Sequence, residues 1–173
     1  MRLSNLVADI IQLSRLDEKN SDLPFEPVDL YELAEDIVLH LDSAASKKNI
    51  NVSLEGNAVT VQGVRHVIYE MLYNIADNAI RYTDQNGTVN IFTGTVNGHA
   101  FYRVEDNGIG MTKERLNQVR GGLTTKIEDS NDFYGLYNVN ERIRLKFGEE
   151  YGLSIDSVLQ EGTCVEVWLP WES

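Results

Sequence analysis

Strand-like segments occur in pairs along this chain, and segments with helical periodicity separate the pairs. Alternation of apolar and polar residues predicts the strands, and apolar residues three and four positions apart predict the helices. Asn97-Gly98 lies between two strand-like segments, and this dipeptide is a strong signal for a tight hairpin. Paired strands with intervening helices favour a sheet that helices cover on one face. The predicted strands are 50–56, 58–63, 87–96, 99–106, 151–158 and 162–170, and the predicted helices are 28–49, 64–82 and 136–147.

The first 18 residues differ from the rest of the chain. Their apolar positions alternate in steps of three and four, as in a helix–helix seam: Leu3, Leu6, Ile10 and Leu13. A helix packed on its own domain explains the same pattern, so both alternatives stay open. Residues 19–27 contain two prolines and predict a linker. The helix that follows has Asp29 as its predicted N-cap, and its apolar face comprises Leu30, Leu33, Ile37 and Leu41.

The 173-residue chain has a net charge of −12. This charge argues against the basic surface that nucleic-acid binders need, so we expect no nucleic-acid partner. A bound phosphate would need local groups such as backbone amides, a metal ion or a few basic side chains. Cys164 is the only cysteine, which excludes an internal disulfide and favours a reducing compartment. The sequence has no apolar run of 18 residues.

The predicted helix over 64–82 carries a polar stripe. Glu70, Asn74 and Asn78 follow one another at four-residue steps, and Arg81 lies close to the same line. A helix turns once in about 3.6 residues, so these side chains share one face. Asn is a mediocre helix former, and the stripe therefore indicates a polar ligand or an exposed face.

Two glycine-bearing segments follow the stripe. Asp106 ends a predicted strand, and Gly108 and Gly110 come directly after it. Such a turn lets a flat ligand approach the backbone, although a plain turn explains the same tripeptide. Gly135 begins a helix, and a helix N-terminus is a favourable anion site. One ligand would explain all three segments: an aminated flat ring, phosphates, and a cation near the Asn stripe.

In these segments the chain resembles the catalytic, ATP-binding domain of sensor histidine kinases, a group shared with gyrase, heat-shock protein 90 and mismatch-repair ATPases. The stretch NIADNAIRYT resembles the N box of the family, DNGIGM its first glycine box and YGLYNVNERI a reduced second glycine box. The closing EGTCVEVWLP resembles the last strand pair, so the resemblance covers about residues 28–170. It implies an α+β fold: a two-layer α/β sandwich whose mixed, largely antiparallel sheet is covered on one face by helices.

The resemblance implies that ATP and Mg²⁺ are the ligands. Asn78 would hold Mg²⁺ through its side-chain oxygen, since this ion prefers hard oxygen ligands. Asn74 would lie one turn earlier, near the phosphates and the waters of the metal. Arg81 matches a position where the family often has a basic residue facing phosphate, and Tyr82 would flank the nucleotide. Asn74 and Arg81 are therefore the expected catalytic residues.

The same resemblance implies an adenine pocket. Asp106 would accept a hydrogen bond from the adenine amine, and Gly108 and Gly110 would leave room for the ring. Residues 112–134 would form a mobile lid. The other residues expected in the pocket are Ile109 and Met111 in its wall, Gly135 and Leu136 at the far end of the lid, and Thr163 near the adenine.

Departures from the family pattern keep other functions open. Phe133 stands where the second glycine box usually has its first glycine, and this favours a degenerate signalling module that does not use nucleotide. Glu70 is expected to be a structural or surface residue, because DNAIRYT fixes Asn78 in the metal position and leaves Asn74 in the position of a hydrolytic base. An amide cannot act as that base, so ATP hydrolysis is disfavoured. An anti-sigma-type serine kinase is a further alternative.

The resemblance also divides the chain and predicts its partners. Residues 1–18 would be the end of the second helix of a dimerisation hairpin, 19–27 a linker and 28–173 the catalytic domain. None of His40, His66 and His99 fits the phosphoacceptor pattern, so the acceptor His is expected on an upstream helix and no autophosphorylation is expected from this fragment. The expected partners are that helix and a response regulator. The parent is expected to be a homodimer in the cell membrane, with this domain in the cytoplasm.

Overall fold

A computed structural model of the chain describes residues 24–125 and 134–172. The predicted helix over 1–18 and Phe133 lie outside these residues. In the described part of the chain, five strands form the main sheet in the order β2 (Asn51–Gly56), β4 (Thr88–Val96), β5 (His99–Asp106), β7 (Gly162–Pro170) and β6 (Gly152–Val158). The β2–β4 pair is parallel and the other three pairs are antiparallel. The predicted mixed, largely antiparallel sheet is therefore confirmed.

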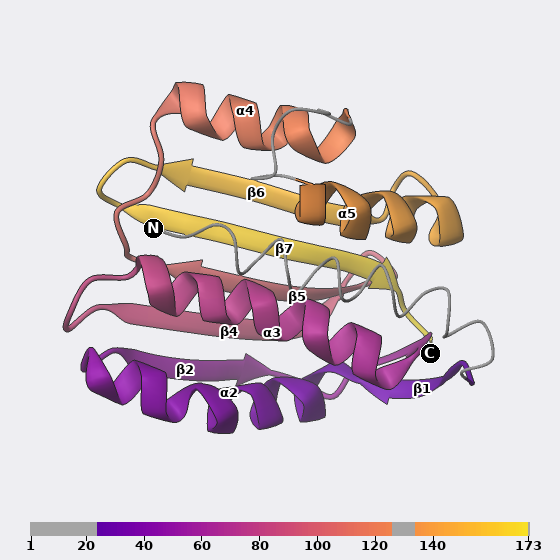
Figure 1. Cartoon of the computed structure of the whole chain (residues 1–173). Coiled ribbons are helices and arrows are strands. Elements are labelled where there is room, and N and C mark those ends of the chain that lie inside the picture. Colours follow the sequence, from indigo (N-terminus) through magenta and orange to yellow (C-terminus); the bar gives the residue numbers. More distant parts are fainter. Residues whose placement is uncertain (1–23, 126–133, 173) are drawn as a thin grey trace.

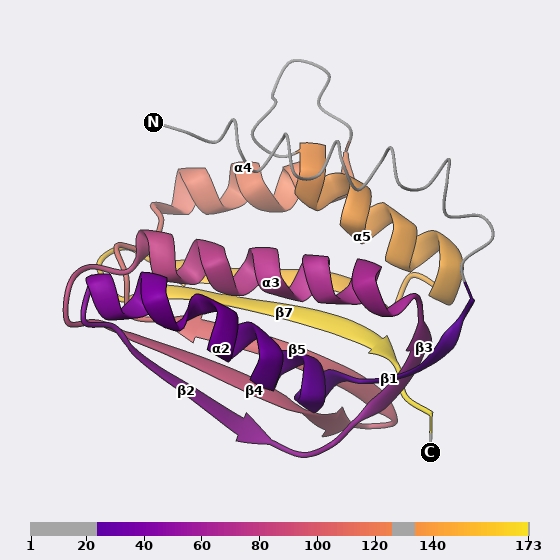
Figure 2. The ribbon, with the colours of Figure 1, turned by 60° about the horizontal axis from the view of Figure 1, so that its bottom comes forward.

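Within residues 24–125 and 134–172, the helices that cover this sheet lie on one of its faces (Figures 1 and 2). They are α2 (Leu30–Lys47), α3 (Arg65–Tyr82) and α5 (Tyr134–Phe147), while α4 (Lys113–Thr124) lies beside the edge strand β6. Asp29 caps α2 as predicted, since its carboxylate accepts a hydrogen bond of 2.8 Å from the Tyr31 amide. The predicted apolar face of α2 is buried, and it packs with α3 and the sheet in one core. The predicted two-layer α+β fold is confirmed.

The hairpin between β4 and β5 turns at Asn97-Gly98 as predicted. Both residues have positive φ angles, 51° and 78°, as a two-residue hairpin of this kind requires. The two strands over 50–63 differ from the β4–β5 hairpin, because they do not pair with each other. β2 joins the main sheet, whereas β3 (Thr60–Gly63) pairs with β1 (Glu26–Asp29) in a separate two-stranded sheet. Glu26 and Pro27, which the sequence places in the linker, are thus part of a strand.

The open face of the sheet carries its own aromatic cluster. The Arg103 guanidinium lies 4.8 Å from the centre of the Phe92 ring and 5.5 Å from that of Phe101. Phe101 in turn packs on Trp168, with ring centres 5.6 Å apart. Arg103 also pairs with Glu166 at 3.6 Å. Cation–π contacts of this kind keep a charged group on partly apolar surface.

A second, smaller core lies under α4. Leu116, Val119 and Leu123 of α4 pack on Ile155 of β6, and Met111 contacts the same cluster. The first half of the predicted lid is therefore a packed helix. Residues 126–133 of that lid lie outside the described residues, and the mobility of the lid stays a prediction.

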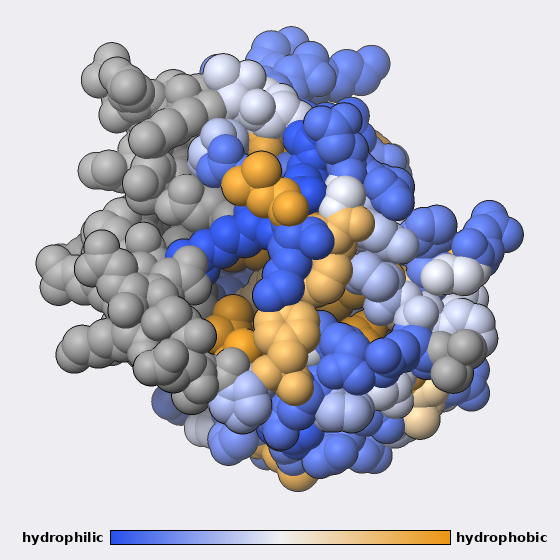
Figure 3. Space-filling model, turned by 90° about the vertical axis from the view of Figure 1, so that its right-hand side faces the viewer, coloured by the Kyte–Doolittle hydropathy of each residue, from blue (hydrophilic) through white to orange (hydrophobic). Residues whose placement is uncertain are grey.

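A pocket of about 490 Å³ lies where β1 and the beginning of α3 meet α2. Glu70, Arg65 and Asp36 are among its lining residues. Figure 3 views the molecule from the end at which β1 lies, where small apolar areas alternate with polar side chains. Across residues 24–125 and 134–172, no helix combines the length and the apolar character needed to span a membrane.

Candidate functional site

α3 carries the polar stripe along the border of the core. Its opposite side is buried and comprises Ile68, Met71, Leu72, Ile75, Ala76, Ala79 and Ile80. Asn74 and Asn78 are half-buried on the stripe, about 6 Å apart along the helix axis. Glu70 lines the pocket towards the beginning of α3, about 12 Å along the axis from Asn78. Glu70 is thus separated from Asn78 by about two turns of the helix.

Arg81 is held by a neighbour on its own helix. Its guanidinium lies 2.8 Å from the carboxylate of Asp77, one turn earlier. Asp77 is not among the residues predicted for the site, although a four-residue Asp–Arg spacing on a helix is itself a signal for such a pair. Tyr82, the last residue of α3, is 51% exposed. Arg81 and Tyr82 therefore lie at the surface where α3 ends.

Asp106 ends β5 opposite Thr163 of β7. Its Oδ1 accepts a hydrogen bond of 2.9 Å from the Gly108 amide, and the Thr163 amide also donates to the carboxylate. Burial raises the pKa of Asp106, while these two hydrogen bonds act in the opposite direction. An ionised carboxylate has about four acceptor positions, so Asp106 keeps capacity for a further donor.

The turn after Asp106, residues 107–110, is clamped on two sides by backbone. The Ile109 amide donates to the Tyr82 carbonyl at 3.3 Å, and the Ile109 carbonyl accepts from the Gln160 amide at 2.7 Å. A Cβ on Gly108 would lie 2.3 Å from the Tyr82 oxygen, and one on Gly110, whose φ is +62°, would lie 1.9 Å from the Val158 oxygen. Both glycines are thus required by packing within the chain, a reason that the local sequence does not reveal. We call residues 106–110 the glycine turn.

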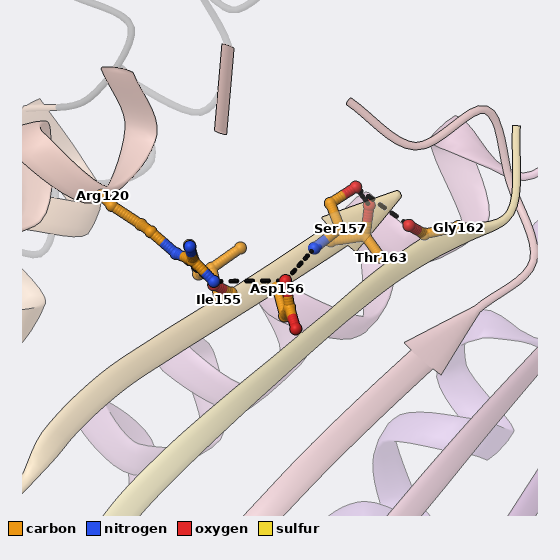
Figure 4. A network of polar contacts seen from close by, with 6 residues as sticks. All are labelled: Arg120, Ile155, Asp156, Ser157, Gly162 and Thr163. Atoms are coloured by element: carbon orange, nitrogen blue, oxygen red, sulfur yellow. Dashed lines mark hydrogen bonds and ion pairs between the residues drawn. The ribbon is translucent and has the colours of Figure 1, made fainter. Parts of the chain in front are cut away.

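A network of polar contacts links Thr163, which pairs with Asp106, to α4 (Figure 4). The Thr163 hydroxyl shares a hydrogen bond of 2.9 Å with that of Ser157, and the Ser157 hydroxyl donates to the Gly162 carbonyl. One residue earlier, Asp156 lies 3.2 Å from the Arg120 guanidinium, whose Nε donates to the Ile155 carbonyl at 2.9 Å. Arg120 thereby attaches α4 to the strand that leads into the β6–β7 turn.

Gly135 and Leu136 lie in the first turn of α5, in agreement with the prediction that Gly135 begins a helix. The structure links α5 to its neighbours through Asn140, which is 4% exposed. Its amide donates to the Leu123 carbonyl at 2.9 Å and accepts from the Leu153 amide at 2.8 Å. Asn140 joins α4, α5 and β6, and nothing in its sequence context distinguishes it from an exposed helix residue.

Hydrogen bonds and close backbone contacts bring part of the predicted site together. Tyr82, Asp106, Gly108, Ile109, Gly110 and Thr163 form one connected group at the end of the sheet where α3 ends. Asn74 and Asn78 lie on the helix that leads into this group, and Met111 packs on the α4 cluster. The acceptors suit a nucleotide, since a carboxylate can accept from an amine. Amide oxygens on one helix face suit Mg²⁺, which prefers oxygen ligands.

Comparison with known proteins decides the family. The model of the histidine kinase-, DNA gyrase B- and HSP90-like ATPase family matches residues 63–173. These residues include the polar stripe, the glycine turn and the last strand pair. The chain belongs to this ATPase family. Within the family, it resembles sensor histidine kinases.

Two curated relatives illustrate the similarity of this ATPase domain to sensor kinases. Sensor protein kinase PmrB of Pseudomonas aeruginosa is 34% identical over 175 residues, covering 98% of this chain and 36% of that protein. Sensor protein QseC of Salmonella typhi is 33% identical over 120 residues, covering 68% of this chain and 26% of that protein. The chain thus spans about a third or less of the length of these relatives.

Solved structures share the fold of the ATPase domain. Histidine kinase ThkA, in a crystal structure with the response regulator TrrA, superposes with a TM-score of 0.70 at 19% identity, covering 98% of this chain and 49% of that one. Full-length ShkA in complex with AMPPNP gives a TM-score of 0.74 at 16% identity, covering 98% of this chain and 36% of that one. At these identities the comparison supports the fold alone.

Proposed function

We propose that this ATPase domain binds ATP with Mg²⁺ and acts as the catalytic domain of a two-component sensor histidine kinase. It would donate the γ-phosphoryl group to a His on an upstream helix. One observation carries the proposal: the Ile109–Tyr82 hydrogen bond joins the glycine turn to the end of the helix that bears Asn74 and Asn78. A single nucleotide can therefore meet an acceptor for its base and ligands for its metal at the same end of the sheet.

Each residue has a defined part in this proposal. Asp106 accepts a hydrogen bond from the adenine amine, and its two backbone donors fix the orientation of the carboxylate. Ile109, 51% exposed, and Met111 contact the ring. Asn78 binds Mg²⁺, which neutralises phosphate charge during phosphoryl transfer. Arg81 is a phosphate ligand only if its guanidinium leaves Asp77 or contacts both groups.

Asn74 positions phosphate and water without removing a proton. A side-chain amide has no basic lone pair of suitable pKa, so Asn74 cannot activate water as a general base. Glu70 is the carboxylate of the stripe, and it lines the pocket near the beginning of α3. The residues of the stripe thus favour phosphoryl transfer to another side chain over hydrolysis of ATP.

The partners follow from the same proposal. A phosphoacceptor helix upstream of the catalytic domain supplies the His, in the same protomer or in the second protomer of a homodimer. The phosphoryl group then passes to a response regulator, the class of partner named in the ThkA crystal structure. We propose that the parent protein lies in the cell membrane with this domain on the cytoplasmic side.

Calorimetric titration of ATP, with and without Mg²⁺, tests the proposal. We expect binding that depends on Mg²⁺ and is weakened at least tenfold by Asn78→Ala. The control is Glu70→Gln. Glu70 lies on the same helix but lines the pocket near the beginning of α3, so the affinity of this variant for ATP should match that of the wild type. Wild-type protein that gives no heat at millimolar ATP would refute the proposed function and leave a nucleotide-independent signalling module as the better explanation.

A further inference from the structure

Lys48 follows the last residue of α2 and reaches across to the end of α3. Its ammonium donates to three carbonyl oxygens: Ile80 at 3.0 Å, Arg81 at 2.8 Å and Thr83 at 2.9 Å. The last carbonyls of a helix have no partner within the helix, and a positive charge is favourable beside them. A lysine ammonium has three donors, so these carbonyls occupy all of them. Lys48 is therefore engaged by α3 and not by a phosphate.

The one carbonyl in this segment that Lys48 leaves out has a different partner. The Tyr82 carbonyl oxygen accepts a hydrogen bond from the Ile109 amide. It also lies 2.3 Å from the position that a Cβ on Gly108 would occupy. Lys48 and the glycine turn thus hold residues 80–83 from two sides. The Lys48 carbonyl also accepts from the Asn86 amide at 3.0 Å, which fixes the loop after α3. In Figures 1 and 2 the ends of α2 and α3 lie side by side at the end of the sheet where β5 ends.

We propose that Lys48 is a positioning residue of the nucleotide site. By holding the C-terminal segment of α3, it sets the distance between Asn78 and the glycine turn. This distance matters because one nucleotide must meet both, and groups that bind a ligand jointly need to be held within about 0.5 Å of their productive geometry. The inference rests on the proposed function. Lys48 lies outside residues 63–173 and directly follows the end of a different helix, α2.

Two variants of Lys48 and one matched control test this role, with a further Lys48 variant held in reserve. Lys48→Met removes the three hydrogen bonds and keeps an unbranched apolar stem. Lys47→Met is the matched control, because Lys47 is exposed in the last turn of α2 and its loss changes the net charge equally. Lys48→Arg keeps the charge and several donors, so it should restore part of the effect. Lys48→Gln, which keeps two donors, replaces Lys48→Met if that variant does not fold.

The readouts are the Kd for ATP with Mg²⁺, measured where circular dichroism shows each variant folded, and the hydrogen-exchange rate of the Ile109 amide without nucleotide. We expect Lys48→Met to raise Kd at least tenfold and to speed exchange at Ile109 at least tenfold. Lys47→Met should stay within twofold on both. A purely stabilising role would leave the Kd of folded molecules unchanged.

Two outcomes would overturn the inference, and they are distinguishable. Wild-type binding together with an unchanged Kd in Lys48→Met would refute the positioning role alone. Absence of binding in wild type and in Lys47→Met would refute the proposed function, and the role of Lys48 in affinity with it.

Discussion

Replacing Gly110 by alanine tests the packing of the glycine turn directly. Gly110 has a φ of +62°, and an added Cβ would lie 1.9 Å from the Val158 carbonyl oxygen. Gly98 provides a matched control, since its φ is +78° but nothing lies within 4 Å of the added Cβ. Both substitutions force an L-residue into the left-handed region. Only Gly110→Ala also creates a collision with the β6–β7 turn.

The two effects can be separated by magnitude. Left-handed backbone costs a non-glycine residue about 1–2 kcal/mol, and this is the whole expected cost of Gly98→Ala. In Gly110→Ala the backbone must also move away from Val158, which breaks the 2.7 Å hydrogen bond from the Gln160 amide to the Ile109 carbonyl. The lost bond adds about 1 kcal/mol, and the displaced packing adds roughly 1–3 kcal/mol. We expect Gly110→Ala to lower the free energy of unfolding by about 3–6 kcal/mol.

Urea denaturation followed by circular dichroism measures this difference. The two variants should show similar m-values, so that their midpoints report stability. If Gly110→Ala costs no more than Gly98→Ala, the glycine turn is not packed on the β6–β7 turn, and close packing does not explain the glycine at position 110. Such a result would favour the role predicted from the sequence, in which Gly110 leaves room for a ligand.

Three further predictions concern single contacts. Burial raises the pKa of Asp106 above its ordinary value of 3.8. The folded state therefore binds the proton more tightly than the unfolded chain, and the free energy of unfolding falls as the pH rises from 3.8 through the pKa of the folded state. Asp106→Asn should thus be at least as stable as wild type at pH 7 and should lose that advantage below pH 3.8. The variant should also bind ATP more weakly. A melting temperature at pH 7 below that of wild type would show that burying the charge is not the dominant cost. Asn140→Ala should cost about 2–5 kcal/mol in urea unfolding, since it leaves the buried Leu123 carbonyl and the partly buried Leu153 amide unpaired. A cost below about 1 kcal/mol, the size of one ordinary hydrogen bond, would show that water replaces the Asn140 amide. Arg120→Met should speed hydrogen exchange in α4 more than Asp156→Asn does, because only the first removes the bond to the Ile155 carbonyl; equal effects would assign the contact to the ion pair.

The features predicted correctly depend on neighbours in the sequence. Asp29 caps a helix through a contact two residues away, and Asn97-Gly98 forms a turn through its own φ angles. The helix over 64–82 follows from apolar periodicity within one segment. In each case the physical cause lies within a few residues, so the pattern alone is sufficient.

The features that the sequence did not predict depend on residues far apart in the chain. Gly110 meets Val158 across 48 positions, and Lys48 reaches carbonyls 32–35 positions away. The pairing of β1 with β3 joins residues on both sides of α2. The sequence predicts Gly108 and Gly110 as room for a ligand, and the backbone atoms that lie against them, Tyr82 O and Val158 O, have no counterpart in that local pattern. Long-range packing of this kind has no local signature.

The aromatic cluster on the open face gives the molecule a built-in optical probe. The chain has two tryptophans: Trp168 packs on Phe101, and Trp171 follows the end of β7. Trp168 lies five residues from Thr163 along one strand, which is about 17 Å. We expect emission from Trp168 to report loss of the sheet rather than events at the glycine turn. Unfolding and ligand binding can be followed in one sample, the first by tryptophan fluorescence and the second by heat.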